Sequence, residues 1–422
     1  MERYTEEKLN KMSVHTLRVI LRSEFGGVPG VCNKSELINQ ILDIQAGASA
    51  PARSTKGRKP LGEFITPISE EISFSDVDED ENCIKKGVFE INADGYGFVR
   101  VNKGAELVDF FVPKTIVKKY DLRTGDELEC SVHYASEMGS LFVNSISTIN
   151  GKMPEVKEPR EQFSQLKSKY PNQKITFKKG MFANVDAVDA FCPIGKGQRC
   201  IVEDPSAKHG TEFVNSLINC ANEDGLKIIT LFAGAKPEAL EEYSPALHSH
   251  YVALPINLGV EEILRAVNLT IERAKTMCLL GNDVLLVIDN LSYIASTYAD
   301  YCMSEKASGY VKMGLSPNKY VSEIFSIGGN FGANKSLTVV ATVDSKRDPR
   351  LFEELASVAT SVIKLKSSDV VSRRGFVVDL NNSYTDKDEL LLEESQVCKV
   401  DEDREKLTKD PEYLSEIYKS FK

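Results

Sequence analysis

The feature that most constrains the fold is a stretch in which an apolar run, a turn and an amphipathic segment follow one another. It starts at Gly195, passes through the apolar residues 200–202 and ends at Thr211. This is the layout of a strand, a phosphate-binding loop and a helix. A working loop reads G-x-x-x-x-G-K-[ST], because its glycines let backbone N–H groups close on phosphate and its lysine supplies the counter-charge. Thr211 fills the last position, but His209 and Gly210 stand where the motif requires glycine and lysine.

From residue 190 onward, β-rich runs alternate with longer runs of helical periodicity. We expect strands at 200–202, 227–232, 283–289, 337–342, 361–365 and 375–379, and helices at 212–222, 237–243, 259–279 and 320–327. That alternation predicts a parallel α/β sheet, whose ligand site lies at the carboxyl ends of its strands.

A different pattern precedes it, with short alternating runs separated by turns. The five expected strands cover residues 88–91, 96–99, 109–112, 127–132 and 141–146. So many short strands in so short a segment predict a small closed barrel of the oligonucleotide-binding type.

The remaining segments complete a multidomain α/β protein. The N-terminal unit reads as two helices around a Gly/Pro break at 26–30, with the second at 37–44. The expected parts are a helical domain (1–46), a linker that is basic and then acidic (47–82), the barrel (83–150), a connector (151–189), and an α/β domain with C-terminal helices (190–422).

Composition narrows the classes of protein. A hydrophobic fraction of 42% with 27% charged residues is typical of a soluble globular chain. No apolar run is long enough to span a membrane, and the nine cysteines lack a C-x-x-C pair, so we expect a reducing cytoplasm and no membrane partner. The formal charge of −10 excludes nucleic-acid binding by overall charge, which leaves a local groove or base stacking.

Aromatic residues of the expected barrel suggest such a stacking surface. Tyr96 and Phe98 lie two apart on one strand and therefore share a face, which Arg100 continues. Phe111 lies on a neighbouring strand, two residues after Asp109. Rings on a barrel face stack bases, a carboxylate accepts a base amino hydrogen, and an arginine reaches phosphate or a carbonyl. The alternative is that these rings fill the barrel core.

At these residues the chain resembles a known family, the bacterial transcription termination factor Rho. The segments Gly87-Val88-Phe89-Glu90-Ile91, Asp94-Gly95-Tyr96-Gly97-Phe98-Val99-Arg100 and Asp121-Leu122-Arg123-Thr124-Gly125-Asp126 are similar to its primary RNA-binding barrel. Residues 5–46 resemble its N-terminal domain, 193–199 the entry to its RecA-type motor domain, and 307–309 its central-pore loop. The resemblance implies that Tyr96, Phe98, Arg100, Asp109 and Phe111 are its primary-site RNA contacts.

The phosphate loop departs from that family, whose pattern is A-P-P-K-A-G-K-T. A gapless match places residues 204–211 there, so that Gly210 occupies the position of the catalytic lysine. Lys208 lies two residues early, and His209 adds a side chain where the backbone should approach phosphate.

Other motor positions depart as well. Ala235 takes the place of the acid that activates water, and Asn382 that of the arginine finger. Asp289, at the end of an apolar strand, matches the acid that holds magnesium through water. Without the base and the finger, the transition state of phosphoryl transfer loses its main stabilising groups.

These observations predict a Rho-like factor that binds single-stranded RNA in transcription termination or its regulation, with an inactive ATPase. The resemblance implies a ring of like or unlike chains, and it leaves RNA polymerase or a complete Rho-type factor open as protein partners. ATP and Mg²⁺ would be cofactors only if nucleotide binding persisted. Two alternatives stay open, an active RNA-dependent ATPase and helicase that uses Lys208 as a substitute, and an oligomerisation scaffold that binds no RNA.

Overall fold

The computed structural model describes a defined part of the chain. The described residues are 9, 12, 17, 20, 34–45, 63–65, 83–103, 106–135, 140–154, 160–206, 208–221, 225–235, 250–256, 258–303, 314–332, 334–370 and 375–421. The expected helix at 237–243, the resemblance at 307–309 and most of the N-terminal unit lie outside them, while the expected helix at 37–44 is found as α3 (Lys34–Gln45). Within the described residues, no helix is both long and apolar enough to cross a membrane.

Five strands close into a barrel, in the order β2-β3-β4-β6-β5. They are β2 (Cys83–Ile91), β3 (Gly97–Lys103), β4 (Glu106–Val112), β5 (Glu127–Ala135) and β6 (Ser140–Ile149). Each overlaps one predicted strand, and β3 begins one residue later than expected. Alternate residues such as Phe89, Val99 and Phe110 point inward and are buried. A helix that the sequence did not predict, α4 (Lys114–Tyr120), joins β4 to β5 and buries Val117 against that core.

The second body is a ten-stranded sheet whose central strands are parallel, in the order β1-β9-β8-β10-β12-β7-β13-β14. Its main strands are β8 (Lys227–Ala235), β9 (His250–Pro255), β10 (Asp283–Asp289), β12 (Ser336–Val343), β7 (Arg199–Glu203) and β13 (Ser361–Ser368). Antiparallel strands β1 (Glu63–Ile65) and β14 (Gly375–Val378) close its two edges, and β11 (Gly329–Asn330) and β15 (Tyr384–Thr385) pair beside it. The predicted fold class, a multidomain α/β chain with a barrel and a parallel sheet, is confirmed.

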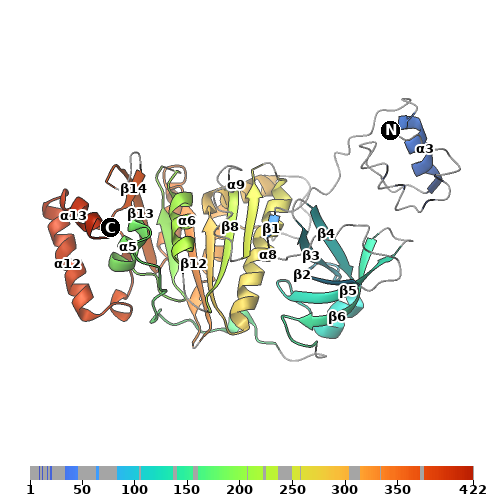
Figure 1. Cartoon of the computed structure of the whole chain (residues 1–422), viewed down its shortest axis with the longest axis horizontal. Helices are drawn as coiled ribbons and strands as arrows, with labels where there is room; N and C mark the ends of the chain where they lie inside the picture. Colours follow the sequence, from blue (N-terminus) through green and yellow to red (C-terminus); the bar gives the residue numbers. More distant parts are fainter. Residues whose placement is uncertain are drawn as a thin grey trace.

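Helices cover both faces of this sheet because its strands are apolar on both sides. Along β10, Leu286 and Ile288 join one hydrophobic core and Leu285 and Val287 join the other. The first face carries α8 (Val260–Leu279), α9 (Leu291–Met303), α10 (Pro317–Phe325) and α11 (Pro349–Ala356), and the second carries α5 (Ala183–Phe191), α6 (Gly210–Cys220), α12 (Glu394–Lys409) and α13 (Tyr413–Ser420). The barrel and the C-terminal helices lie at opposite ends of the sheet (Figure 1).

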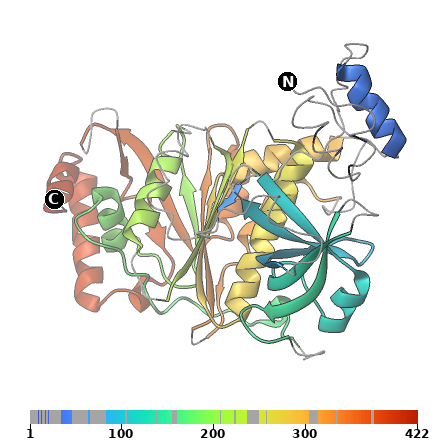
Figure 2. The ribbon, with the colours of Figure 1, turned by 45° about the vertical axis from the view of Figure 1, so that its right-hand side comes forward.

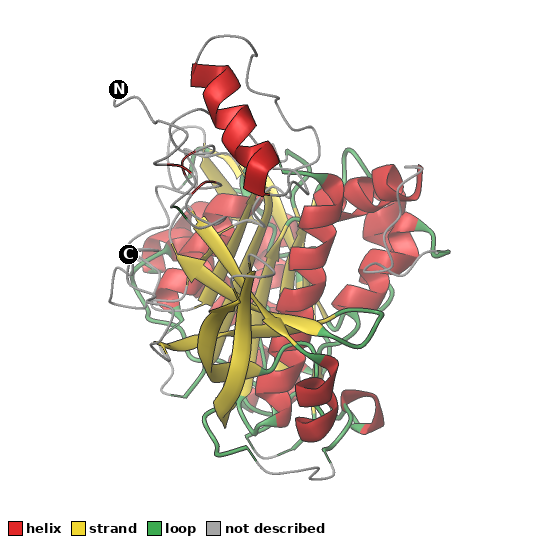
Figure 3. Cartoon of the chain, turned by 90° about the vertical axis from the view of Figure 1, so that its right-hand side faces the viewer, coloured by secondary structure: helices red, strands yellow, loops and turns green. Residues whose placement is uncertain are grey.

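Helix α8 lies between the sheet and the barrel, as Figure 2 shows, and Figure 3 shows the barrel from its free side. The turn before β5 presses against this helix, since a Cβ added at Gly125 would lie 2.5 Å from the carbonyl oxygen of Glu272. Arg273 of α8 donates to the carboxylate of Glu127 at 2.7 Å and to the carbonyl of Gly125 at 3.2 Å. The barrel is therefore docked on the α/β domain through buried polar contacts.

Candidate nucleic-acid interface and phosphate loop

An aromatic cluster lies on the barrel where β3 and β4 pair. Phe98 is directly opposite Phe111 in the ladder, and Tyr96 immediately precedes β3. The ring centroids of Tyr96 lie 5.8 Å from Phe98 and 5.3 Å from Phe111. These three rings are half-exposed and lie outside the barrel core, which Phe89 and its apolar neighbours fill. The expectation that the rings share a face is met, and the alternative that they fill the core is wrong.

Two further rings, which the sequence reasoning missed, extend this cluster. The ring of Phe142 on β6 lies 5.0 Å from that of Phe111, and the ring of His133 on β5 lies 6.0 Å from Phe142. Phe142 pairs with Phe111 through the strand contact that closes the barrel. A contact between strands so far apart in sequence has no local signal, although Phe142 could have been found by its alternation with the buried Val143.

The glycine before Phe98 allows the cluster to form. A Cβ added at Gly97 would lie 2.2 Å from the ring of Phe89 and 2.6 Å from the carbonyl oxygen of Glu90. Only glycine lets β3 approach the core ring of Phe89 so closely, and this packing fixes the register in which Phe98 faces Phe111.

Arg100, which we expected to reach phosphate or a carbonyl of RNA, lies beneath the rings. Its side chain is buried under the aromatic face, with the guanidinium 4.8 Å from the Phe98 centroid. It donates to Glu90 at 2.9 and 2.5 Å and is ion-paired with Asp109, its ladder partner. Burial alone would lower the pKa of Arg100, but the charges of Glu90 and Asp109 outweigh it and raise that pKa. The guanidinium is thus fully charged and held by carboxylates, and Asp109 is the more exposed member of the pair.

The phosphate loop binds a group of its own chain. The carboxylate of Asp204, which follows β7, accepts backbone N–H groups from Ser206 at 3.0 Å, His209 at 2.8 Å and Gly210 at 2.7 Å. It also accepts the Ser206 hydroxyl at 2.6 Å, and the residue is only 4% exposed. Burial would raise the pKa of Asp204, but these hydrogen bonds outweigh it and hold that pKa below its usual value. The backbone N–H groups of Ser206, His209 and Gly210, at the place of a phosphate loop, thus bond a carboxylate of their own chain.

The neighbouring residues reinforce this arrangement. The ring of His209 stacks on Phe376 at 5.0 Å, while Lys208 is exposed. A Cβ added at Gly210 would lie 3.4 Å from the Asp204 carboxylate and 3.3 Å from Thr342, so a lysine there would start beside that carboxylate. The glycines at 195 and 197 lie at the opposite end of β7, where Gly197 donates to the Thr338 hydroxyl at 2.8 Å. They lie in the turn that leads into β7 and take no part in the loop.

Asp289 ends β10 at the same edge, 5% exposed. It accepts the Thr211 hydroxyl at 2.6 Å and that of Thr342 on β12. Burial raises the pKa of Asp289, and these two hydrogen bonds only partly offset the effect. The structure therefore brings together Asp289, Thr211, Gly210 and the loop, as the sequence predicted. Among the described residues, no group of three or more histidine, cysteine, aspartate or glutamate side chains could hold a metal ion.

Two further residues differ from the family pattern, Ala235 and Asn382, and neither takes part in the loop contacts described above. Ala235, which takes the place of the acid that activates water, is the last residue of β8. Asn382 is exposed after β14 and donates to the Asp379 carboxylate at 2.9 Å. Neither residue offers a carboxylate or guanidinium in its place.

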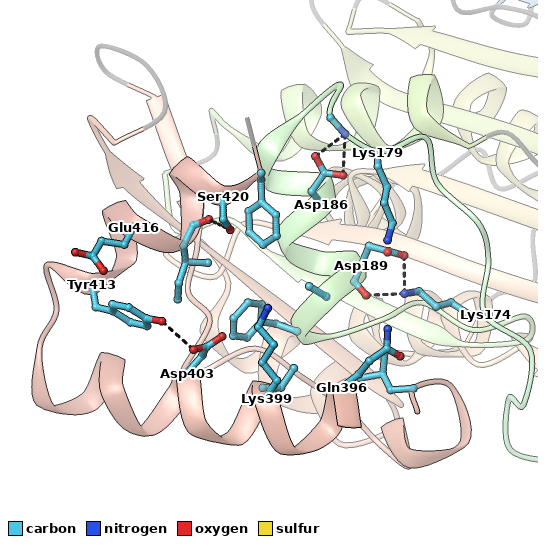
Figure 4. Close-up of a pocket in the computed structure, with 17 residues that line it drawn as sticks. Lys174, Lys179, Asp186, Asp189, Gln396, Lys399, Asp403, Tyr413, Glu416 and Ser420 are labelled. Carbon is cyan, nitrogen blue, oxygen red and sulfur yellow. Dashed lines mark hydrogen bonds and ion pairs between the residues drawn. The ribbon is translucent and has the colours of Figure 1, made fainter. Parts of the chain in front are cut away.

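A separate pocket of about 660 Å³ lies between α5 and the C-terminal helices. Figure 4 shows that Lys174 points toward Asp189 and Tyr413 toward Asp403. Lys174 donates to the Asp189 carbonyl at 2.7 Å, and the Tyr413 hydroxyl donates to Asp403 at 2.9 Å. These contacts link some of the lining residues to one another.

Comparisons with known proteins agree with the barrel. The family model described as "Rho termination factor, RNA-binding domain" matches residues 85–155. The chain is similar to proteins named transcription termination factor Rho from Gemmatimonas aurantiaca (28% identical, covering 74% of this chain and 45% of that protein), Bacillus subtilis (23%, covering 82% and 84%) and Thermotoga maritima (26%, covering 75% and 76%). The match thus spans less than half the length of the Gemmatimonas relative. A solved chain described as a prototypical ATPase from a type III secretion system covers 65% of this chain at 19% identity, with a TM-score of 0.47.

The matched segment, residues 85–155, contains the aromatic cluster and the Glu90–Arg100–Asp109 contacts. The relatives extend the similarity over about three quarters of the chain, across both the barrel and the α/β domain. The chain is thus similar to Rho termination factors over about three quarters of its length, and its barrel matches the model of their RNA-binding domain.

Proposed function

We propose that this chain is a single-stranded RNA-binding factor that acts in transcription termination or its regulation without hydrolysing ATP itself. The observation that carries the proposal is the half-exposed cluster of Tyr96, Phe98, Phe111 and Phe142 on the barrel. Aromatic rings on such barrels stack bases, and each stack contributes about 1–3 kcal/mol. Because the chain has a formal charge of −10, stacking rather than phosphate attraction supplies the affinity.

The second part of the proposal concerns the α/β domain. Catalysis of phosphoryl transfer depends on groups that cradle the phosphates, position water and neutralise charge. Here Asp204 occupies the loop, Gly210 stands in the lysine position, and Ala235 and Asn382 replace the base and the finger. These independent departures support a domain that retains its fold without turnover. Its protein partner would then be a complete Rho-type factor, within a ring, or RNA polymerase.

The RNA proposal is tested by fluorescence anisotropy with a labelled single-stranded RNA of about 12 nucleotides, within the span of one barrel of this type. We expect Tyr96→Ala with Phe98→Ala to weaken binding by about 1–3 kcal/mol per lost stack. Tyr170→Ala removes an equally aromatic but exposed side chain outside the barrel and serves as the matched control. Equal affinity of the double variant and the wild type would instead favour the scaffold alternative.

The inactive-ATPase proposal is tested by measuring ATP hydrolysis with and without RNA. Hydrolysis above background by the purified wild type would refute it. The active-enzyme alternative further requires that Lys208→Ala abolish binding of a labelled ATP analogue. Since Lys208 is exposed and its backbone N–H bonds Ser206 at 3.2 Å, we expect that variant to behave as the wild type.

A further inference from the structure

One buried carboxylate joins the aromatic face of the barrel to the α/β domain. Glu90 on β2 accepts hydrogen bonds from Arg100 at 2.9 and 2.5 Å. The same carboxylate accepts Arg265 of α8 at 2.7 and 3.3 Å. Arg265 is 175 residues away in sequence and belongs to the other domain. Two guanidinium groups, one from each domain, therefore share one carboxylate.

Burial makes these contacts necessary. Glu90 and Arg265 are each 7% exposed and Arg100 is 5% exposed. A buried charge that loses its partner is strongly destabilised, so each member depends on the others to keep its position. Burial would raise the pKa of Glu90, but the hydrogen bond from Arg265 and the two positive charges outweigh it and hold that pKa below its usual value.

The network ends at the proposed RNA site. Arg100, held by Glu90, lies under the ring of Phe98 and is ion-paired with Asp109, which is partly exposed beside the rings. With Arg265 in place, the two carboxylates and two guanidinium groups carry no net charge. Without it, Glu90 would bond Arg100 alone, and the four positions would carry one net negative charge under a surface that receives RNA.

We propose that Arg265, a residue of the α/β domain, is a positioning residue for the RNA site: it holds Glu90, and through Glu90 it fixes Arg100 beneath Phe98 and beside Asp109. This inference rests on the proposed RNA-binding function of the barrel. It makes the α/β domain part of the RNA site without any contact between that domain and RNA. It also gives this domain a role that requires no ATP.

Two simpler explanations predict different behaviour. If Arg265 acted only by its charge, Arg265→Gln would weaken RNA binding and Glu90→Gln would strengthen it, since the two changes have opposite signs. If Arg265 only docked the domains, Arg273→Gln would have the same effect, because Arg273 is also on α8 and holds Glu127 at 2.7 Å. Arg273 also donates to the carbonyl of Gly125, in the turn before β5, and to the side chain of Asn150. None of the hydrogen bonds of Glu90 and Arg100 described above involves it.

The experiment compares RNA affinity, by anisotropy with labelled RNA homopolymers of the four bases, across full-length variants. We expect Arg265→Gln and Glu90→Gln each to weaken binding by about three- to thirtyfold, the range of couplings within one hydrogen-bonded network. The double variant should bind no more weakly than Glu90→Gln alone, since Arg265 acts through Glu90. Arg265→Lys, which keeps the charge and one donor, should recover part of the loss, and Arg273→Gln should remain close to the wild type.

Each other outcome overturns the inference. Unchanged affinity of Arg265→Gln, opposite effects of Glu90→Gln and Arg265→Gln, additive effects in the double variant, or an equal loss in Arg273→Gln would each do so. Circular dichroism identifies a variant that fails to fold, in which case Glu90→Gln and Arg265→Lys decide the question. A wild type that bound no RNA would refute the proposed function itself. If the wild type bound RNA and Arg265→Gln bound it with the same affinity, this inference alone would be refuted.

Discussion

Asp204 shows how one side chain decides what a loop can bind. Its carboxylate accepts the same kind of backbone N–H groups, at 2.7 and 2.8 Å, that a phosphate loop offers to its ligand. An anion from solution must displace a carboxylate that is already bound and already charged. The N–H groups of Ser206, His209 and Gly210 are consequently satisfied within the chain.

We predict that Asp204→Ala gains affinity for a nucleotide. Each charge-assisted hydrogen bond contributes about 1.5–3 kcal/mol, so freeing these donors should improve binding of a fluorescent ADP analogue by about tenfold or more. Hydrolysis should stay at background because Ala235 and Asn382 are unchanged. Asp344→Ala is the matched control, since Asp344 follows β12 at the same edge and accepts the N–H of Arg347 at 3.0 Å. Equal nucleotide binding by the wild type and Asp204→Ala would show that Asp204 does not block the loop.

The lowered pKa of Asp204 also predicts a pH dependence. A carboxylate with a lower pKa in the folded state adds stability above its unfolded pKa of about 3.9 and loses it as the pH falls through the folded value. Asp204→Asn should therefore be less stable than the wild type near neutral pH, and the difference should shrink below about pH 4. Urea unfolding of both proteins at a series of pH values measures this difference in the free energy of unfolding. A difference that stayed constant from neutral to acid pH would contradict the assignment.

Among the elements, β3 depends on one glycine. A Cβ at residue 97 would overlap the ring of Phe89, so we predict that Gly97→Ala lowers the free energy of unfolding by about 1–3 kcal/mol, as expected for overpacking. It should also weaken RNA binding, because β3 carries Phe98. Thermal unfolding and anisotropy measure the two effects. Adding Phe89→Leu should recover part of the stability by making room, and failure of that rescue would mean that the contact is not the cause.

The elements differ in how far the sequence could predict them. Strands β10 and β12 follow from their apolar runs, and α8 follows from its amphipathic period. Helix α9 was missed because Ser, Thr, Tyr and Ala along it give no polar face, and α5 because it begins inside the polar connector. Strand β1 is three residues long and pairs with β9, which lies far along the chain, so no local sequence pattern predicts it.

The residues of the candidate sites also differ in how far the sequence could predict them. Ring positions 96, 98 and 111 follow from alternation along strands, which is local. Asp204 left a usable signal, since an Asp followed by Pro and Ser favours a turn in which the side chain bonds the backbone. The hydrogen bond between Glu90 and Arg265 has no signal in the local sequence, because it depends on where the whole barrel docks on α8.

For the whole molecule, α8 is the element through which barrel and sheet become one body. Its apolar face packs on the sheet, and it presents Arg265 and Arg273 to the barrel. Both arginines are largely buried and paired with barrel carboxylates, Glu90 and Glu127. Breaking a buried pair costs several kcal/mol because it leaves an uncompensated charge, so separating the domains is strongly disfavoured.

We therefore predict that the barrel and the α/β domain unfold in one calorimetric transition, and that Arg265→Gln with Arg273→Gln separates it into two. Each domain has its own hydrophobic core, so each can unfold separately once the docking contacts are lost. The barrel, with the smaller core, should unfold first. Lys409→Gln with Lys275→Gln removes the same charge from more exposed ion pairs and should leave a single transition. If the arginine variant also unfolded in one step, the domains would be coupled by apolar contacts alone, and the role of the buried ion pairs would be limited to orientation within the barrel.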